Sequence, residues 1–166
     1  MDITHLVEKA KKLRQEGSYD KAEALLKSAI DEEINDWSIW DQLGHVMVAK
    51  TDYEEAVEAF RKAVDLNSSS FFSWLSLGYA SKEGGDLAGA IAFTEAAMDL
   101  TETPLHQGMV LYNLACYTCL SGEKEKALNY LERCFKKDES IKDWAREDSD
   151  LDALRTDARY IRLLEN

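Results

Sequence analysis

The chain has 166 residues, a net charge of −12, 45% hydrophobic residues and a single proline. This composition supplies enough apolar side chains for a folded core, which excludes a disordered chain. No stretch approaches the roughly 18 continuous apolar residues of a membrane span, and the N-terminal residues lack a signal-peptide pattern. Three cysteines, an odd number, do not make a disulfide framework, so we expect a protein of the reducing cytoplasm.

A fixed interval runs through the first hundred residues. Ala22, Ala56 and Ala90 are 34 residues apart, and Trp40 and Trp74 share the same step. A period of this length predicts one helical unit stacked on copies of itself.

Each unit reads as two amphipathic helices joined by a tight turn. In the second repeat, Asp36 is the predicted N-cap of the first helix. The two helices are expected to cross at the small residues Gly44 and Ala56, with the large side chains of Trp40 and Phe60 filling the space beside them. The predicted boundaries are residues 3–36, 37–70, 71–104 and 108–141, followed by a capping segment at 142–166.

The fourth unit follows a shift of phase. The step from Ala90 to Ala127 is 37 residues instead of 34, and the extra residues lie near Pro104. Because proline is favoured in the first turn of a helix, Pro104 is expected to begin one.

The motifs Trp40-x-x-Leu43-Gly44 and Tyr53-x-x-Ala56-x-x-x-Phe60 resemble the tetratricopeptide repeat family. The resemblance implies an all-α fold, a right-handed α–α superhelix of about four helix-turn-helix repeats plus C-terminal capping helices, forming a single domain over residues 1–166.

The last stretch, residues 142–166, has lost the period. It is similar to the capping tail of prokaryotic members of this family, and the end of a stacked array needs such a cover for its apolar face. The side chains expected to cover that face are Trp144, Leu151, Leu154, Tyr160, Ile161 and Leu164.

In stacked helix pairs the first helices line the concave side, so their residues outside the core stripe are the candidate partner-binding residues. A peptide or an amphipathic helix of another protein is the expected ligand, with the aromatic side chains as anchors. The alternative is that these aromatics pack against a neighbouring helix or the cap. The candidates are Lys11, Arg14, Asp41, Gln42, His45, Phe72, Leu75, Tyr79, Lys82, Met109, Tyr112, Asn113 and Cys116.

Catalytic, metal and cofactor sites are not expected. Cys116 and Cys119 form a CxxC, but it lies within a predicted helix without a second CxxC, and packing explains it better than thiol chemistry. The carboxylate clamp known in the family is not inherited, because its lysine, asparagine and arginine positions retain a match only at Lys11.

The sequence therefore predicts a non-catalytic adaptor or scaffold that is a monomer or a weak dimer. Residues 51–103 hold ten acidic and three basic residues, which disfavours nucleic acid and favours a basic partner, unless the acids serve only solubility. Two alternatives stay open: a dedicated chaperone for a partner protein, and a structural module that self-assembles through its ends.

Overall fold

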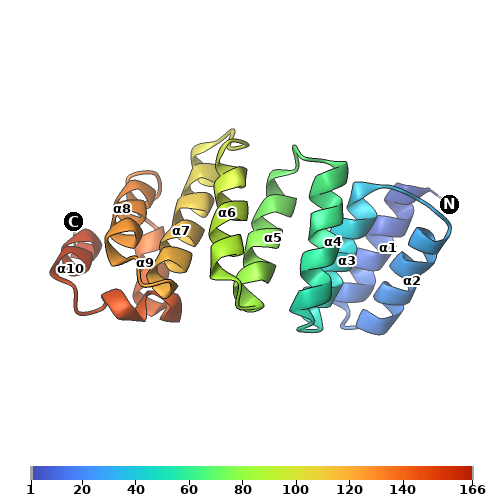
Figure 1. Cartoon of the computed structure of the whole chain (residues 1–166), viewed down its shortest axis with the longest axis horizontal. Coiled ribbons are helices and arrows are strands. Elements are labelled where there is room, and N and C mark those ends of the chain that lie inside the picture. Colours follow the sequence, from blue (N-terminus) through green and yellow to red (C-terminus); the bar gives the residue numbers. More distant parts are fainter. Residues whose placement is uncertain (1, 166) are drawn as a thin grey trace. The chain divides into compact units, whose positions relative to one another are not determined.

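The computed structural model describes residues 2–165, and this part of the chain is helical and contains no strand. The all-α prediction is confirmed. None of the helices in the described part is long and apolar enough to cross a bilayer. The helices labelled in Figure 1, with the short 3₁₀ helix η1, are α1 (Ile3–Gln15), α2 (Tyr19–Asp31), α3 (Trp37–Ala49), α4 (Tyr53–Leu66), α5 (Phe71–Glu83), α6 (Leu87–Met98), α7 (Pro104–Leu120), α8 (Lys124–Phe135), α9 (Ile141–Glu147), η1 (Ser149–Leu154) and α10 (Ala158–Glu165).

The chain forms two compact units, Met1–Gly85 and Asp86–Asn166. In unit 1, α1 to α5 pack as consecutive neighbours, and α3 also contacts both α1 and α5. In unit 2, α7 packs between α6 and α8, and η1 lies on α7.

The helices begin where the sequence places capping side chains. Asp36 Oδ1 accepts a hydrogen bond from Ser38 N at 2.9 Å, so the predicted N-cap is confirmed. Pro104 is the first residue of α7, as predicted, and Thr103 caps that helix by accepting from His106 N.

A residue with positive φ separates the first and second helices of each repeat. After α3 this residue is Thr51, and the turn is a Schellman motif in which Asp52 N donates to Met47 O at 2.9 Å. A left-handed conformation is costly for a β-branched residue. The equivalent residues of the other repeats are Gly17, Gly85 and Gly122.

The core of unit 1 is centred on the crossing of α3 and α4. A Cβ on Gly44 would lie 2.6 Å from Cε1 of Phe60, whose side chain is fully buried. Phe60 thus fills the space beside Gly44 as predicted, whereas Trp40 is only half-buried. Other buried side chains of unit 1 include Leu6, Leu26, Ile39, Leu43, Met47 and Leu77.

In unit 2 the C-terminal segment packs into one core with α7 and α8. Leu151, Leu154 and Tyr160 are buried as predicted, and the Tyr160 hydroxyl donates to Ala145 O at 2.6 Å. The prediction for Trp144 and Ile161 is wrong, because they are 74% and 42% exposed.

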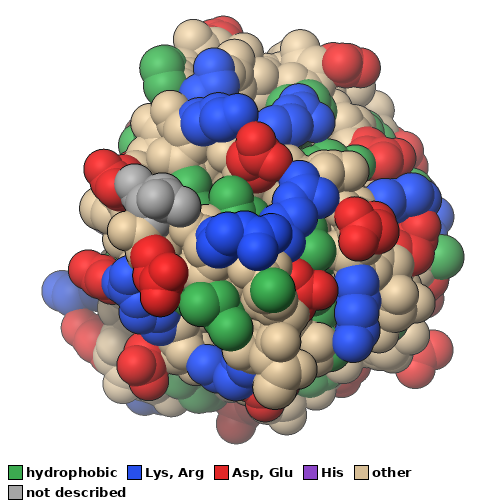
Figure 2. Space-filling view, turned by 90° about the vertical axis from the view of Figure 1, so that its left-hand side faces the viewer, with side chains coloured by type: hydrophobic (Ala, Val, Ile, Leu, Met, Phe, Trp, Pro, Cys, Tyr) green, Lys and Arg blue, Asp and Glu red, His purple; other side chains and the backbone are tan. Residues whose placement is uncertain are grey.

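Helix geometry explains these two corrections. The buried residues of α9 are Lys142 and Ala145, three positions apart, so Trp144 falls on the outer face of the helix. Ile161 follows Tyr160, the buried residue of α10, and therefore points away from the core. Figure 2 looks onto this end of unit 2, where Lys and Arg side chains gather with hydrophobic side chains between them.

Candidate functional site

Unit 1 contains most of the predicted partner-binding residues, on α1, α3 and α5. Lys11, His45 and Tyr79 stand 34 residues apart and hold the same position in successive repeats. We call this surface the α1–α3–α5 face and define it by Arg14, Asp41, Gln42, His45, Phe72 and Tyr79.

Asp41 connects α3 to α5 on this face. One of its carboxylate oxygens accepts from Ser73 Oγ at 2.7 Å. The other accepts from Gln42 Nε2 at 3.3 Å and lies 3.6 Å from His45 Nε2. Ser73, which is fully buried, was not among the predicted site residues, although it fixes the carboxylate that organises them.

His45 is half-buried, with 33% of its side chain exposed. Burial lowers its pKa, an effect that Asp41 opposes and Arg14 reinforces. Its ring meets the Phe60 ring edge-on, with centroids 5.1 Å apart. The histidine therefore serves as a mainly neutral packing group at neutral pH.

Two polar atoms beside this cluster are buried without a hydrogen-bond partner among the described residues: Arg14 Nε, a donor, and Gln42 Oε1, an acceptor. An unpaired buried polar atom costs about 1–3 kcal/mol, and native structures contain few of them.

Large aromatic side chains are exposed on α5. Phe72 is 57% exposed, and Tyr79, one heptad later on the same side of the helix, is 41% exposed. Lys82 Nζ lies 5.6 Å from the centre of the Tyr79 ring. Leu75, between them, is buried and presents little surface to a partner.

The predicted residues of unit 2 have different surroundings. The Tyr112 hydroxyl donates to Asp148 Oδ2 at 2.7 Å, and Cys116, only 4% exposed, lies 3.6 Å from the same oxygen. Burial and the Asp148 carboxylate raise the pKa of Tyr112. Met109 and Asn113 are half-buried. The chain's own η1 segment thus covers the part of α7 that holds Tyr112 and Cys116.

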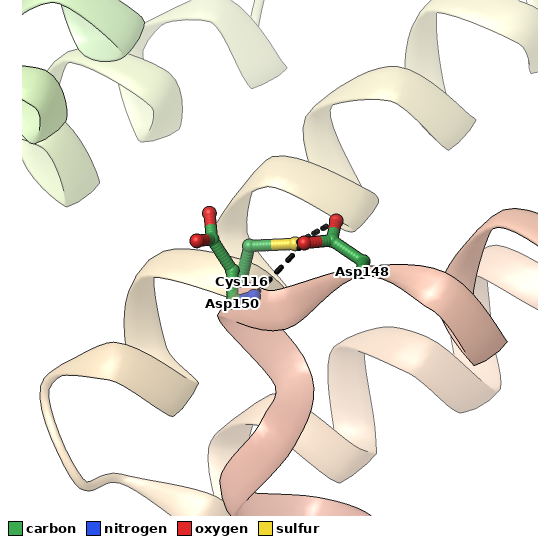
Figure 3. A group of neighbouring side chains, drawn as sticks. All are labelled: Cys116, Asp148 and Asp150. Atoms are coloured by element: carbon green, nitrogen blue, oxygen red, sulfur yellow. Dashed lines mark hydrogen bonds between the residues drawn. The ribbon is translucent and has the colours of Figure 1, made fainter.

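Cys116, Asp148 and Asp150 form a small cluster (Figure 3), with their ligand-type atoms within 4.8 Å of one another. A thiol and two carboxylates could contribute to a transition-metal site. In the structure, however, Asp148 is engaged in hydrogen bonds: Oδ1 accepts from Asp150 N at 2.9 Å and Oδ2 from Tyr112 and Cys116. The arrangement acts as a clasp between η1 and α7.

The cysteines have the environment of structural thiols. Burial raises the pKa of Cys116 and of Cys119, the two members of the CxxC, and raises that of Cys134 to about 12. A reactive cysteine requires a lowered pKa, so these residues are suited to packing rather than to thiol chemistry.

The comparisons with known proteins agree with this architecture. Residues 38–70 match the family described as tetratricopeptide repeat. A search of curated proteins gives no match. Among solved structures, the chain is similar to MamA, with 22% identity and a TM-score of 0.74 over 99% of this chain and 94% of that one. It is also similar to PilF of Pseudomonas aeruginosa, with 19% identity and a TM-score of 0.79 over 98% and 72% of the two chains.

Sequence identities this low establish only that the folds are similar. The matched segment comprises α3 and α4, and helix pairs of similar length, joined by the same left-handed turn, precede and follow it. Residues 38–70 thus form a tetratricopeptide repeat, and the helix pairs on either side share its architecture.

Proposed function

We propose that this protein is a non-catalytic interaction scaffold that holds a segment of a partner protein on the α1–α3–α5 face. Repeat proteins of this kind use preformed helical surfaces to bind other proteins, which keeps the ordering cost of binding low. The observation that carries the proposal is the exposure of two aromatic side chains on this face, Phe72 at 57% and Tyr79 at 41%.

The chemistry of this face suits a peptide. An apolar side chain of the peptide would cover Phe72, and full burial of such an aromatic contributes about 1.5–3 kcal/mol. The net charge of −12 favours a partner segment that carries basic residues.

Affinity capture from the source cells tests the proposal. The intact protein and a Phe72→Ala variant would serve as bait, and each captured partner would be measured with both proteins by calorimetry. We expect Phe72→Ala to weaken binding about tenfold or more, as for an aromatic hot spot. Tyr79→Ala should also weaken binding, because it removes the second exposed aromatic side chain of this face.

Leu105→Ala is the matched control. Leu105 is 60% exposed, close to the 57% of Phe72, but it lies on α7 in the other unit. Equal loss of binding in the two variants, or no loss in Phe72→Ala while the protein remains folded, would place the partner elsewhere.

A further inference from the structure

A pocket of about 510 Å³ opens between α8, α9 and α10, at the end of unit 2 seen in Figure 2. Four basic and two acidic side chains contribute to its lining, in a chain whose net charge is −12. We call it the C-terminal pocket. Its lining residues are Glu132, Phe135, Lys136, Glu139, Lys142, Arg159, Arg162 and Leu163.

Lys142 is the unusual residue of this pocket. Lysine is seldom buried, yet Lys142 is only 8% exposed, and its Nζ lies 6.0 Å from the centre of the Phe135 ring. Phe135 is itself buried and Leu163 is half-buried, so the ammonium group stands beside an apolar wall.

Glu139 compensates the charge of Lys142. Its carboxylate lies 2.7 Å from Lys142 Nζ, and this contact lowers the pKa of Glu139. Counting side-chain atoms alone, Lys142 is 11% exposed and Glu139 is 74% exposed. A carboxylate so exposed is held weakly, because the pairing must compete with water and with side-chain entropy.

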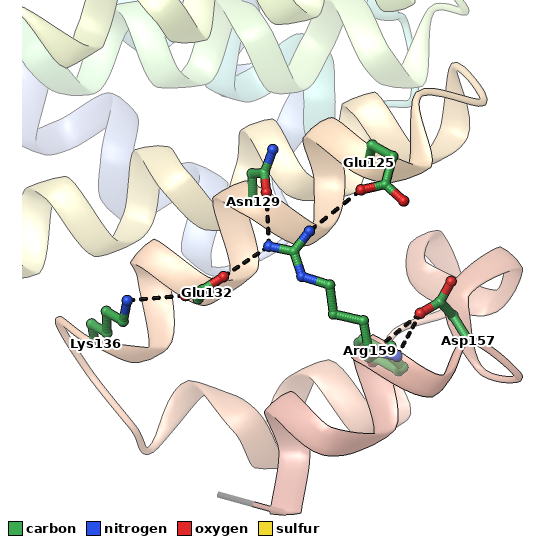
Figure 4. A network of polar contacts seen from close by, with 7 residues as sticks. Glu125, Asn129, Glu132, Lys136, Asp157 and Arg159 are labelled. Carbon is green, nitrogen blue, oxygen red and sulfur yellow. Dashed lines mark hydrogen bonds and ion pairs between the residues drawn. The ribbon is translucent and has the colours of Figure 1, made fainter.

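The opposite wall is fixed. Arg159 on α10 donates to Asn129 and Glu132 of α8, each at 2.7 Å, and lies 3.4 Å from Glu125 (Figure 4). Asp157 anchors the start of α10 by accepting from Arg159 N at 2.7 Å. These contacts keep the pocket preformed.

We propose that the C-terminal pocket binds an acidic peptide segment of a partner protein. A glutamate of that segment replaces Glu139 on Lys142, and an adjacent apolar side chain packs against Phe135 and Leu163. The proposal commits to a peptide carboxylate because Glu139 already shows a peptide-borne carboxylate seated on this ammonium. The excess of basic side chains around the pocket favours the same charge.

Calorimetric titration with a short acetylated and amidated peptide of glutamate and leucine tests this site on the full chain. Lys142→Gln should weaken binding about tenfold, because the buried cation is lost. Glu139→Gln should strengthen binding by about two- to fivefold, because it removes the competing carboxylate of an exposed ion pair. These opposite directions distinguish ligand exchange from a general loss of fold.

Two controls make the test specific. Lys137→Gln removes an exposed lysine that neighbours the pocket in sequence without lining it, and it should leave the affinity within twofold, apart from a small loss of long-range attraction. The same peptide with glutamine in place of glutamate should bind at least about tenfold more weakly. Phe72→Ala should leave the affinity for this peptide unchanged, so the test of the C-terminal pocket is independent of the α1–α3–α5 face.

Equal affinities for the intact protein, Lys142→Gln and Glu139→Gln would overturn the proposal. If Lys142→Gln failed to fold, as judged by circular dichroism, unchanged affinity in Glu139→Gln would suffice to reject it. Binding of the free fatty acid octanoate without binding of the peptide would reject the peptide assignment.

Discussion

The α1–α3–α5 face of unit 1 and the surface of α7 in unit 2 place equivalent residues in different surroundings. Tyr79 and Cys116 hold the same repeat position, separated by 37 residues because of the shifted fourth repeat. Tyr79 is 41% exposed, whereas Cys116 is 4% exposed and covered by the segment that carries Asp148. Position within a repeat therefore sets the direction of a side chain, and the chain that follows decides whether that side chain remains accessible.

The difference also limits where a partner can bind. The Tyr112 hydroxyl is already bound to Asp148 and the surface around Cys116 is filled, so a ligand there would have to displace η1. On the α1–α3–α5 face, Phe72 and Tyr79 are 57% and 41% exposed. We therefore place the proposed partner contact on unit 1 and treat the surface of α7 around Tyr112 and Cys116 as part of the protein's own core.

The largest effect is expected from removing the cover of α7. Leu151 of η1 is fully buried, so Leu151→Ala should lower the free energy of unfolding by about 2–5 kcal/mol. Urea unfolding measures this loss. The variant should also expose Cys116, and a thiol reagent followed by mass spectrometry should label it faster than in the intact protein. Leu120→Ala, at a 42% exposed position, is the control and should change stability by less than about 0.5 kcal/mol.

The second largest effect is expected from a tight glycine contact that is present in unit 1 and absent from its counterpart in unit 2. Gly44→Ala places a Cβ 2.6 Å from the Phe60 ring and should destabilise unit 1 by about 1–3 kcal/mol, despite the better helix propensity of alanine. Gly108→Ala is the counterpart in unit 2, where the new Cβ would meet Ile141 Cδ1 at an ordinary 3.7 Å. Thermal unfolding should show a loss only for the first variant, and similar losses in both would contradict the packing difference.

Alkaline pH should destabilise unit 2, which contains all three cysteines. Burial raises the pKa of Cys134 from 9.0 to about 12. Between these values the unfolded chain releases a proton that the folded chain retains, so the free energy of unfolding falls as pH rises, by about 1.4 kcal/mol per pH unit at most. Cys134→Ala should reduce this slope in urea unfolding, and an unchanged slope would show that the thiol ionises equally in both states.

The smallest effect is expected from removing one hydrogen bond of the clasp that joins η1 to α7. Tyr112→Phe removes one half-buried hydrogen bond to Asp148 and should cost about 1 kcal/mol. Hydrogen–deuterium exchange should become faster in η1 while unit 1 is unaffected. Tyr53→Phe, in unit 1, is the matched control and should leave exchange in η1 unchanged.

The repeat fold could be predicted because its determinants are local. Asp36 caps Ser38 two residues away, Gly44 and Phe60 lie in one helix hairpin, and the 34-residue period repeats such local relations along the chain. The cover of α7 could not be predicted in this way, because Tyr112 and Asp148 are 36 residues apart and no periodic pattern relates them.

The site was predictable to a similar extent. Helical periodicity identified Asp41, Gln42 and Phe72 as residues outside the core stripe. Ser73 was missed because it is the immediate neighbour of Phe72, and only the packing of α5 on α3 brings its hydroxyl to Asp41. Leu75 and Cys116 have the right position for a groove, but their exposure depends on neighbours that the period does not specify.

The left-handed turn has a consequence for the kinetics of folding. Each helix pair closes over a few residues, so a hairpin can form from nearby contacts before the pairs dock on one another. Where Gly17 or Gly122 closes the pair, the chain enters the turn readily, whereas Thr51 must adopt φ 60 against the preference of its branched side chain. The α3–α4 hairpin should therefore form later than its intrinsic helix content suggests, and Thr51→Gly should accelerate refolding in stopped-flow measurements.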